Sequence, residues 1–381
     1  MQYRKLFTAL LAACLDIIAL PSYAQEPIAP PRAPGPSSDS LLNVEILPGV
    51  RKLEFRKLND SVQLTILAGN VKLKQGTSLF YCDSCVINNN TRTFEAWGSV
   101  HINDSDTAHV YSTHMRYLMD KRIAFLDGGV RLTDGKGTLT TPDLEYDMTT
   151  SIGTYLHGGR VVNKKTTLTS REGFYYADLH DVYFKNNVVL VDPAYTIWTD
   201  SLLYNTQTQM TRFIARTLIK DSSGRTIETK EGYYNLATGE AEFGQRPIII
   251  DGPRRYIANR IISNDSIVQL IGNAVVTDSV QGTTVIAGLI LQDRKSEKTL
   301  ATNKPLMIIK QEDDSIYITA DTLFSARLTD LHGTKDSLVK DTVKGRKVVS
   351  VNQKDSTNRY LEAYRHVRIF SDSLQAVGDS L

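Results

Sequence analysis

The chain has 381 residues, of which 41% are hydrophobic and 23% charged, and its formal net charge at pH 7 is +2. A charge this close to zero, with no basic block along the chain, argues against a nucleic-acid partner. The length could hold two or three ordinary domains, or one array of structural repeats.

Residues 1–24 have the pattern of a cleavable export signal. Arg4 and Lys5 precede an apolar run, and a small-x-small cleavage motif ends at Ala24. The run is too short for a stable membrane span. The pattern predicts export across the membrane with cleavage after Ala24. A lipobox-like stretch that ends at Cys14 gives the alternative, in which Cys14 is acylated and becomes the mature N-terminus.

Residues 25–43 predict a linker that is rich in proline. Proline fixes the backbone and removes a hydrogen-bond donor, which disfavours both helix and sheet. We therefore expect an extended tether between the export signal and the folded body. Its prolines are Pro27, Pro30, Pro31, Pro34 and Pro36.

Residues 44–327 contain a short phrase that returns at nearly constant spacing, with its first two copies 29 positions apart. Valine and leucine alternate with polar residues in each copy, which places them on one face of a strand. Polar turns and two further short strands follow in each unit, so the repeat predicts an all-β array of stacked units. Copies begin at Gly69, Gly98, Gly128 and Gly158, and weaker ones at Asn186, Ala215, Gln245 and Gly272.

Residues 328–360 break this rhythm and predict a polar insertion. Residues 361–381 then start a further repeat that is incomplete at Leu381. We expect either a truncated sequence or an open strand edge, which is a site for association.

The sequence offers little that resembles a catalytic or metal site. Cys82 and Cys85 have the spacing of a redox or metal half-site, but corresponding positions of other repeats hold small and apolar residues. Residues three apart on a strand also face opposite sides unless a bulge intervenes. Asp143, Glu145 and Asp147 alternate with apolar residues as on a solvated face, which disfavours a polysaccharide-processing enzyme. We predict no catalytic residue, no cofactor and no metal.

The stretch from Leu67 to Gly76, with the strand from Leu79 to Val86 behind it, resembles the OstA/LptA family of periplasmic lipopolysaccharide-transport proteins. The resemblance covers roughly residues 44–325 and resumes near Leu361. The long array and the polar insertion are most similar to the OstA-like proteins of Bacteroidetes-type bacteria.

The resemblance implies an elongated, antiparallel β-jelly-roll in which two sheets form an open V with an apolar groove. It implies a non-enzymatic periplasmic protein that carries or bridges lipopolysaccharide, or a similar amphiphile, between the inner and outer membranes. Other Lpt-type transport components and further copies of the chain, joined end to end, are the implied partners.

Eight inward apolar residues are the candidate lipid-binding positions, although the sequence leaves open whether they line a groove or fill a closed core. A right-handed β-solenoid, acting as an exported adhesin or scaffold, is the alternative, and strand direction separates the two folds. The eight candidates are Val71, Leu73, Val100, Ile102, Val130, Leu132, Val188 and Leu190.

Overall fold

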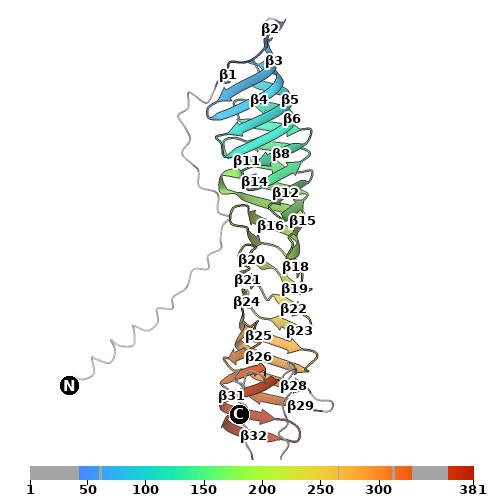
Figure 1. Ribbon diagram of the computed structural model, residues 1–381, viewed down its shortest axis with the longest axis vertical. Coiled ribbons are helices and arrows are strands. Elements are labelled where there is room, and N and C mark those ends of the chain that lie inside the picture. The colour runs from blue at the N-terminus through green and yellow to red at the C-terminus, as the bar shows by residue number, and fades with distance from the viewer. Residues whose placement is uncertain (1–42, 60–61, 265, 311–313, 328–358) are drawn as a thin grey trace, which may run out of the picture. The chain divides into compact units, whose positions relative to one another are not determined.

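The computed structural model describes residues 43–59, 62–264, 266–310, 314–327 and 359–381 (Figure 1). The predicted export signal, nearly all of the proline-rich linker and the predicted insertion up to residue 358 lie outside these ranges. The described residues form thirty-two strands and one short 3-10 helix, η1 (Ala177–Leu179), with no α-helix among them. None of the helical structure in these ranges has the length and apolar character needed to cross a membrane.

The strands build two half-sheets that share their longest strands. Each long strand contributes one half to each half-sheet. The shared strands are β3 (Val62–Gln75), β4 (Ser78–Asn88), β5 (Thr93–Asp104), β6 (Ala108–Leu118), β15 (Asp181–Val191), β16 (Tyr195–Asn205), β25 (Ile267–Asp278), β26 (Thr283–Asp293) and β31 (Arg359–Phe370).

Half-sheet I consists of the second half of β3 and the strands, or halves of shared strands, that are hydrogen-bonded to it one after another. Its own short strands are β1 (Glu45–Ile46), β8 (Val130–Thr133), β9 (Thr138–Thr141), β12 (Gly159–Asn163), β13 (Thr166–Ser170), β18 (Thr217–Asp221), β19 (Thr226–Thr229), β22 (Ile248–Asp251), β23 (Arg254–Ile257), β28 (Leu306–Lys310), β29 (Ser315–Thr319) and β32 (Gln375–Ser380).

Half-sheet II consists of the first half of β3 and the strands, or halves of shared strands, that are hydrogen-bonded to it one after another. Its own short strands are β2 (Lys52–Asn59), β7 (Ile123–Asp127), β10 (Leu144–Asp147), β11 (Ile152–Tyr155), β14 (Glu172–Tyr176), β17 (Met210–Phe213), β20 (Glu231–Asn235), β21 (Ala241–Gly244), β24 (Arg260–Ser263), β27 (Thr299–Thr302) and β30 (Thr322–Arg327).

Pairing follows chain order in both half-sheets, so each repeat lies against the one before it and the one after it (Figure 1). Every pair of described strands is antiparallel, as in β4 with β5 and β15 with β16. The prediction of an all-β, antiparallel jelly-roll built from repeats is confirmed. The alternative of a right-handed β-solenoid is wrong, because a solenoid stacks parallel strands.

The repeated phrase marks the corner where the chain passes from half-sheet II to half-sheet I. Pairing of β3 with β4 shifts between Ala68 and Val71, at the first copy. Gly69 has φ +77° and Gly98 has φ +73°, a left-handed conformation that glycine adopts without steric cost. Asn186 has φ +62° at a weaker copy, and asparagine is among the few other residues that tolerate this region.

The corner also changes the orientation of the two cysteines. Pairing of β4 with β5 shifts between Tyr81 and Ser84, so Cys82 and Cys85 both point inward and are buried. The expectation that they face opposite sides applies to a strand without a bulge, and the bulge seen here is the exception that it allows. Both thiols are free, and they pack in the core as small apolar residues.

Candidate functional site

The eight candidate lipid-binding residues all point into the space between the half-sheets. Their exposed fractions range from 0 to 2%. Val71 and Leu73 lie on β3, Val100 and Ile102 on β5, and the remaining four on β8 and β15. The structure thus brings them together along the inner face of half-sheet I, where they are sealed from solvent.

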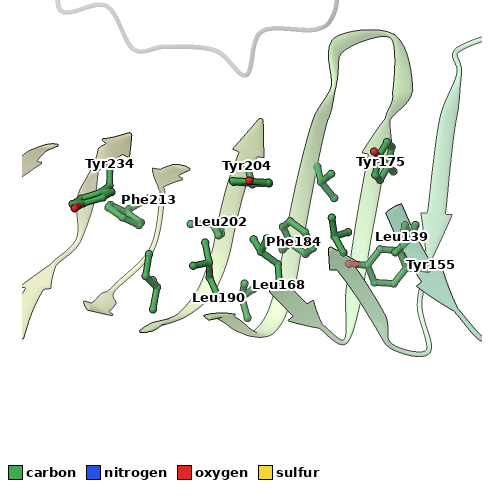
Figure 2. Close-up of a cluster of buried hydrophobic side chains, with 14 of the residues drawn as sticks. Leu139, Tyr155, Leu168, Tyr175, Phe184, Leu190, Leu202, Tyr204, Phe213 and Tyr234 are labelled. Atoms are coloured by element: carbon green, nitrogen blue, oxygen red, sulfur yellow. The ribbon is translucent and has the colours of Figure 1, made fainter. Parts of the chain in front are cut away.

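The two half-sheets pack directly on each other in the first repeats. Phe80 of half-sheet I lies 5.3 Å from Phe94 and 4.8 Å from Tyr117 of half-sheet II, measured between ring centroids. Figure 2 shows a later part of the same interior, where Leu168 and Leu190 of half-sheet I lie near Phe184 and Leu202 of half-sheet II. In these repeats the inward side chains fill a core.

A column of tyrosines closes the free edge of this core, opposite the corner. One tyrosine stands in each of five successive repeats of half-sheet II, 29 or 30 positions apart, on the strand that enters the hairpin turn. All five are buried. The sequence analysis missed this column, although the spacing of its members made it visible. They are Tyr117, Tyr146, Tyr175, Tyr204 and Tyr234.

Polar residues at the hairpin turns of half-sheet I form hydrogen bonds with three members of this column. Tyr117 donates its hydroxyl hydrogen bond to Gln75, and Tyr146 donates to Asp104 Oδ2 at 2.9 Å. Tyr204 accepts from Asn163 Nδ2 at 3.1 Å. Each bond joins the free edges of the two half-sheets, and we call this row of contacts the tyrosine seam. It shuts the interior of the first repeats.

The tyrosine column ends after Tyr234, and the interior opens there. The next two positions of the column are Ser263 and Gln292, each 29 residues after the one before. Each is followed by an Asn or Asp that caps the turn, as Tyr146, Tyr204 and Tyr234 are. Serine and glutamine leave space that a phenol ring would fill. A cavity of about 420 Å3 lies at this place, with Gln292 in its wall.

The cavity has an apolar wall and a charged rim. Val276, Val285, Met307 and Ile309 from half-sheet I line it and are only partly buried, unlike the sealed residues of earlier repeats. Its volume lies within the range of small-ligand sites, about 300–1,000 Å3. A second, more polar cavity of about 420 Å3 adjoins it and shares Gln292 and Arg254 in its lining.

Three arginines converge on Glu297 at the rim. Arg327 lies 2.8 Å from its carboxylate, Arg359 lies 3.4 Å away and Arg254 lies 3.5 Å away. Arg254 also pairs with Asp278 at 3.1 Å. Three guanidinium groups therefore share two carboxylates, and we call these five residues the arginine cluster.

Burial and neighbouring charges shift the pKa values of two groups in the arginine cluster. Burial lowers the pKa of the Arg359 guanidinium, and the positive charge of Arg254 lowers it further. A hydrogen bond from Arg327 lowers the pKa of the Glu297 carboxyl against the effect of its burial. The cluster thus places three guanidinium groups and two carboxylates beside the apolar cavity.

The described ranges contain no group of three or more His, Cys, Asp or Glu side chains arranged to hold a metal ion. Asp143 and Glu145 face away from the core, while Leu144 and Tyr146 between and beside them are buried. Asp143 accepts a hydrogen bond from His157 at 2.9 Å on this outer face. The arrangement agrees with the prediction of an ordinary solvated face at these carboxylates.

Comparison with known proteins gives one family. A family model described as OstA-like protein matches residues 46–200, which confirms the family resemblance over this segment. Among solved structures, the chain is similar to the crystal structure of LptH, the LptA homologous periplasmic component of the conserved lipopolysaccharide transport device from Pseudomonas aeruginosa. The identity is 16%, the match covers 29% of this chain and 82% of that chain, and the TM-score is 0.26. No curated protein matches.

Proposed function

Taking the OstA-like segment of residues 46–200 as the premise, we propose that this chain is a periplasmic, non-enzymatic protein that binds lipopolysaccharide and carries or bridges it between the inner and outer membranes. The observation that carries the proposal is the shared apolar interior of the two half-sheets, which opens into the cavity beside Gln292. Each methylene of an acyl chain that enters such an interior gains about 0.8 kcal/mol.

The eight inward candidate residues contact the acyl chains of lipopolysaccharide once the tyrosine seam opens. Opening one repeat breaks a seam hydrogen bond, at about 0.5–1.5 kcal/mol, and separates the apolar side chains that pack across the two half-sheets. The acyl methylenes that enter, at about 0.8 kcal/mol each, offset this cost because they take the place of the separated side chains. Val71 and Val100 then become acyl-chain contacts, whereas Val285 and Leu361 in the cavity wall are available beforehand.

Contact with other transport components and end-to-end association of copies belong to the same proposal. Strand β32 pairs with β31 along one edge, and all six of its residues are exposed. A strand edge of this kind supports the addition of a further strand through main-chain hydrogen bonds.

Photo-crosslinking tests the lipopolysaccharide proposal. A photoreactive amino acid is placed at Leu361 in the cavity wall, at Val100 in the sealed core, or at the outward-facing Gln269 as the control. We expect lipopolysaccharide adducts at Leu361, fewer at Val100 and none at Gln269. The absence of adducts at every inward position would overturn the proposal.

A further inference from the structure

A pocket of about 530 Å3 lies on the outer side of half-sheet I, at a corner close to the C-terminal end. Three of its lining residues, Leu306, Thr319 and Arg368, are paired in register on β28, β29 and β31. They alternate with residues of the core, so their side chains point outward. The corners add Lys304 and His366 to the lining. The pocket is therefore separate from the apolar interior between the half-sheets.

The lining of this corner pocket contains two cationic groups without a partner. Lys304 and Arg368 form no ion pair or side-chain hydrogen bond with any residue that the structure describes. Asp321 is the one carboxylate in the lining, and it accepts a hydrogen bond from His366 Nδ1 at 3.0 Å. Two free cations thus share the pocket with one carboxylate that is already engaged by a histidine.

The backbone bears a conformational cost to keep a lysine at this corner. Lys304 has φ +60°, in the left-handed region that lysine seldom adopts. Asn70 and Gly129 hold the corresponding position at earlier corners, and both residue types tolerate this region better. The geometry of the corner therefore does not call for lysine, which suggests that its charge has a use.

An earlier corner offers a comparison. A pocket of about 410 Å3 there is lined by Thr140, His157 and Arg160, among others. His157 donates to Asp143 at 2.9 Å, as His366 donates to its aspartate in the later pocket. No lysine is among the lining residues of the earlier pocket. Of the two, the later pocket alone brings two cationic side chains together.

We propose that the corner pocket of Lys304 and Arg368 is a binding site for a phosphate-type oxyanion. Phosphate presents several acceptor oxygens, to which an ammonium and a planar guanidinium donate charge-assisted hydrogen bonds. The Thr319 hydroxyl, which has no hydrogen-bond partner within the described ranges, is a further donor. The inference goes beyond the proposed function and does not rest on it, because the pocket lies outside the interior that would hold acyl chains.

Chemical protection of Lys304 measures binding at this place. The full chain is treated with sulfo-NHS-acetate in sodium phosphate or in sodium chloride of equal ionic strength, and peptide mass spectrometry gives the acetylation rate of each lysine. We expect phosphate to slow the acetylation of Lys304 severalfold. Lys220, an exposed lysine on β18 of the same outer face, should react equally fast in both salts. Equal rates at Lys304 in the two salts would overturn the proposal.

Substitutions around the pocket test which groups hold the anion. Arg368→Gln should raise the phosphate concentration for half-protection of Lys304 about tenfold, as the loss of one charge-assisted hydrogen bond predicts. Arg368→Lys keeps a cation and should restore part of the protection. Asp321→Asn removes a carboxylate that repels the ligand and should lower the concentration for half-protection. Arg160→Gln, in the earlier pocket, is the matched control and should leave it unchanged. An unchanged value in both Arg368→Gln and Asp321→Asn would show that the pocket does not hold the anion.

The phosphate could belong to a soluble compound or to the head group of a lipid, and vesicles distinguish these sources. Phosphatidylcholine vesicles with phosphatidic acid replace the phosphate salt, and pure phosphatidylcholine vesicles are the control. Protection by inorganic phosphate alone supports the site and assigns it a soluble phosphate, whereas protection by both supports it and assigns it a lipid head group. Protection by the vesicles without protection by inorganic phosphate would indicate general attraction to a charged surface and would count against the site.

Discussion

Asp134 Oδ2 accepts a hydrogen bond from His180 Nδ1 at 2.8 Å, which ties a hairpin turn of half-sheet I to the turn after η1 in half-sheet II. The same oxygen accepts from Thr206 Oγ1 at 2.9 Å. Its other oxygen accepts from the backbone amides of Lys136 and Gly137. One carboxylate with an inaccessible side chain therefore joins three separate turns across the seam.

Replacing Asp134 by Asn should destabilise the protein by about 1–3 kcal/mol at pH 7, because the amide group cannot accept all of these bonds. Burial acts to raise the pKa of the Asp134 carboxyl, but the hydrogen bonds from Gly137 and His180 outweigh it and leave the pKa below its usual value. A lowered folded-state pKa gives stability that is complete above about pH 4 and is lost as pH falls through the folded-state value.

Urea denaturation of the wild type and Asp134→Asn, followed by circular dichroism from pH 7 to pH 2.5, measures both effects. The difference in unfolding free energy should shrink below about pH 4. Asp379→Asn, on the exposed strand β32, is the matched control and should change little. A difference that stays constant down to the lowest pH would contradict the role of the Asp134 carboxylate.

The hydroxyl of Tyr146 provides a second test of the seam. Tyr146→Phe keeps the ring in the core and removes the bond to Asp104, which also accepts from Ser78 Oγ at 2.7 Å. We expect a loss of about 1–2 kcal/mol, since a buried carboxylate oxygen loses its donor. Tyr111→Phe on the outer face is the control, with an expected change within about 0.5 kcal/mol. Equal denaturation midpoints for the two variants would show that the seam hydroxyls add no stability.

The sequence predicted the repeat period and the inward valines and leucines because both depend on local alternation. Val71, Leu73, Val100 and Ile102 all point inward, as their spacing required. It did not predict that the phrase at Gly69 is a corner, since a strand and a bent strand have the same apolar pattern. The binding of lipid at these residues stays a prediction.

The cavity and the arginine cluster were beyond a local analysis for a different reason. Arg359 meets Glu297 across 62 positions of the chain, and no short spacing brings them together. The opening of the interior could have been found, because Ser263 and Gln292 continue a column that is tyrosine in five earlier repeats. Finding this opening from the sequence required an alignment of the strands that carry the tyrosines, in addition to the alignment of the glycine phrase.

The corner itself can be tested at Gly98. An added Cβ there would run into the carboxylate of Asp83, and alanine pays about 1–2 kcal/mol in the left-handed region. Gly98→Ala should therefore lower the free energy of unfolding by at least that amount, measured by urea denaturation. Asn186→Gly, at a corner with φ +62°, should be neutral or slightly stabilising. A neutral Gly98→Ala would mean that the corner tolerates a side chain and is not fixed by glycine.

The two cysteines should be inert in the folded protein. Cys85 is completely buried. A hydrogen bond with Cys82 is the main cause that raises the pKa of its thiol, and burial raises this pKa further. Because the thiolate is the reactive form, both the pKa and the burial oppose alkylation. Treatment with iodoacetamide at pH 8, followed by mass spectrometry, should leave both unmodified in native protein and modify both in urea.

An exposed thiol provides the control for reagent activity. Lys136→Cys, on a solvent-exposed turn, should be alkylated in native protein within minutes while Cys82 and Cys85 stay intact. Rapid native alkylation of either core cysteine, or recovery of a bond between them from freshly purified protein, would contradict the assignment of both as packing residues. Such a result would instead indicate that the first corner opens in solution, because neither sulfur is reachable while β3, β4 and β5 remain paired.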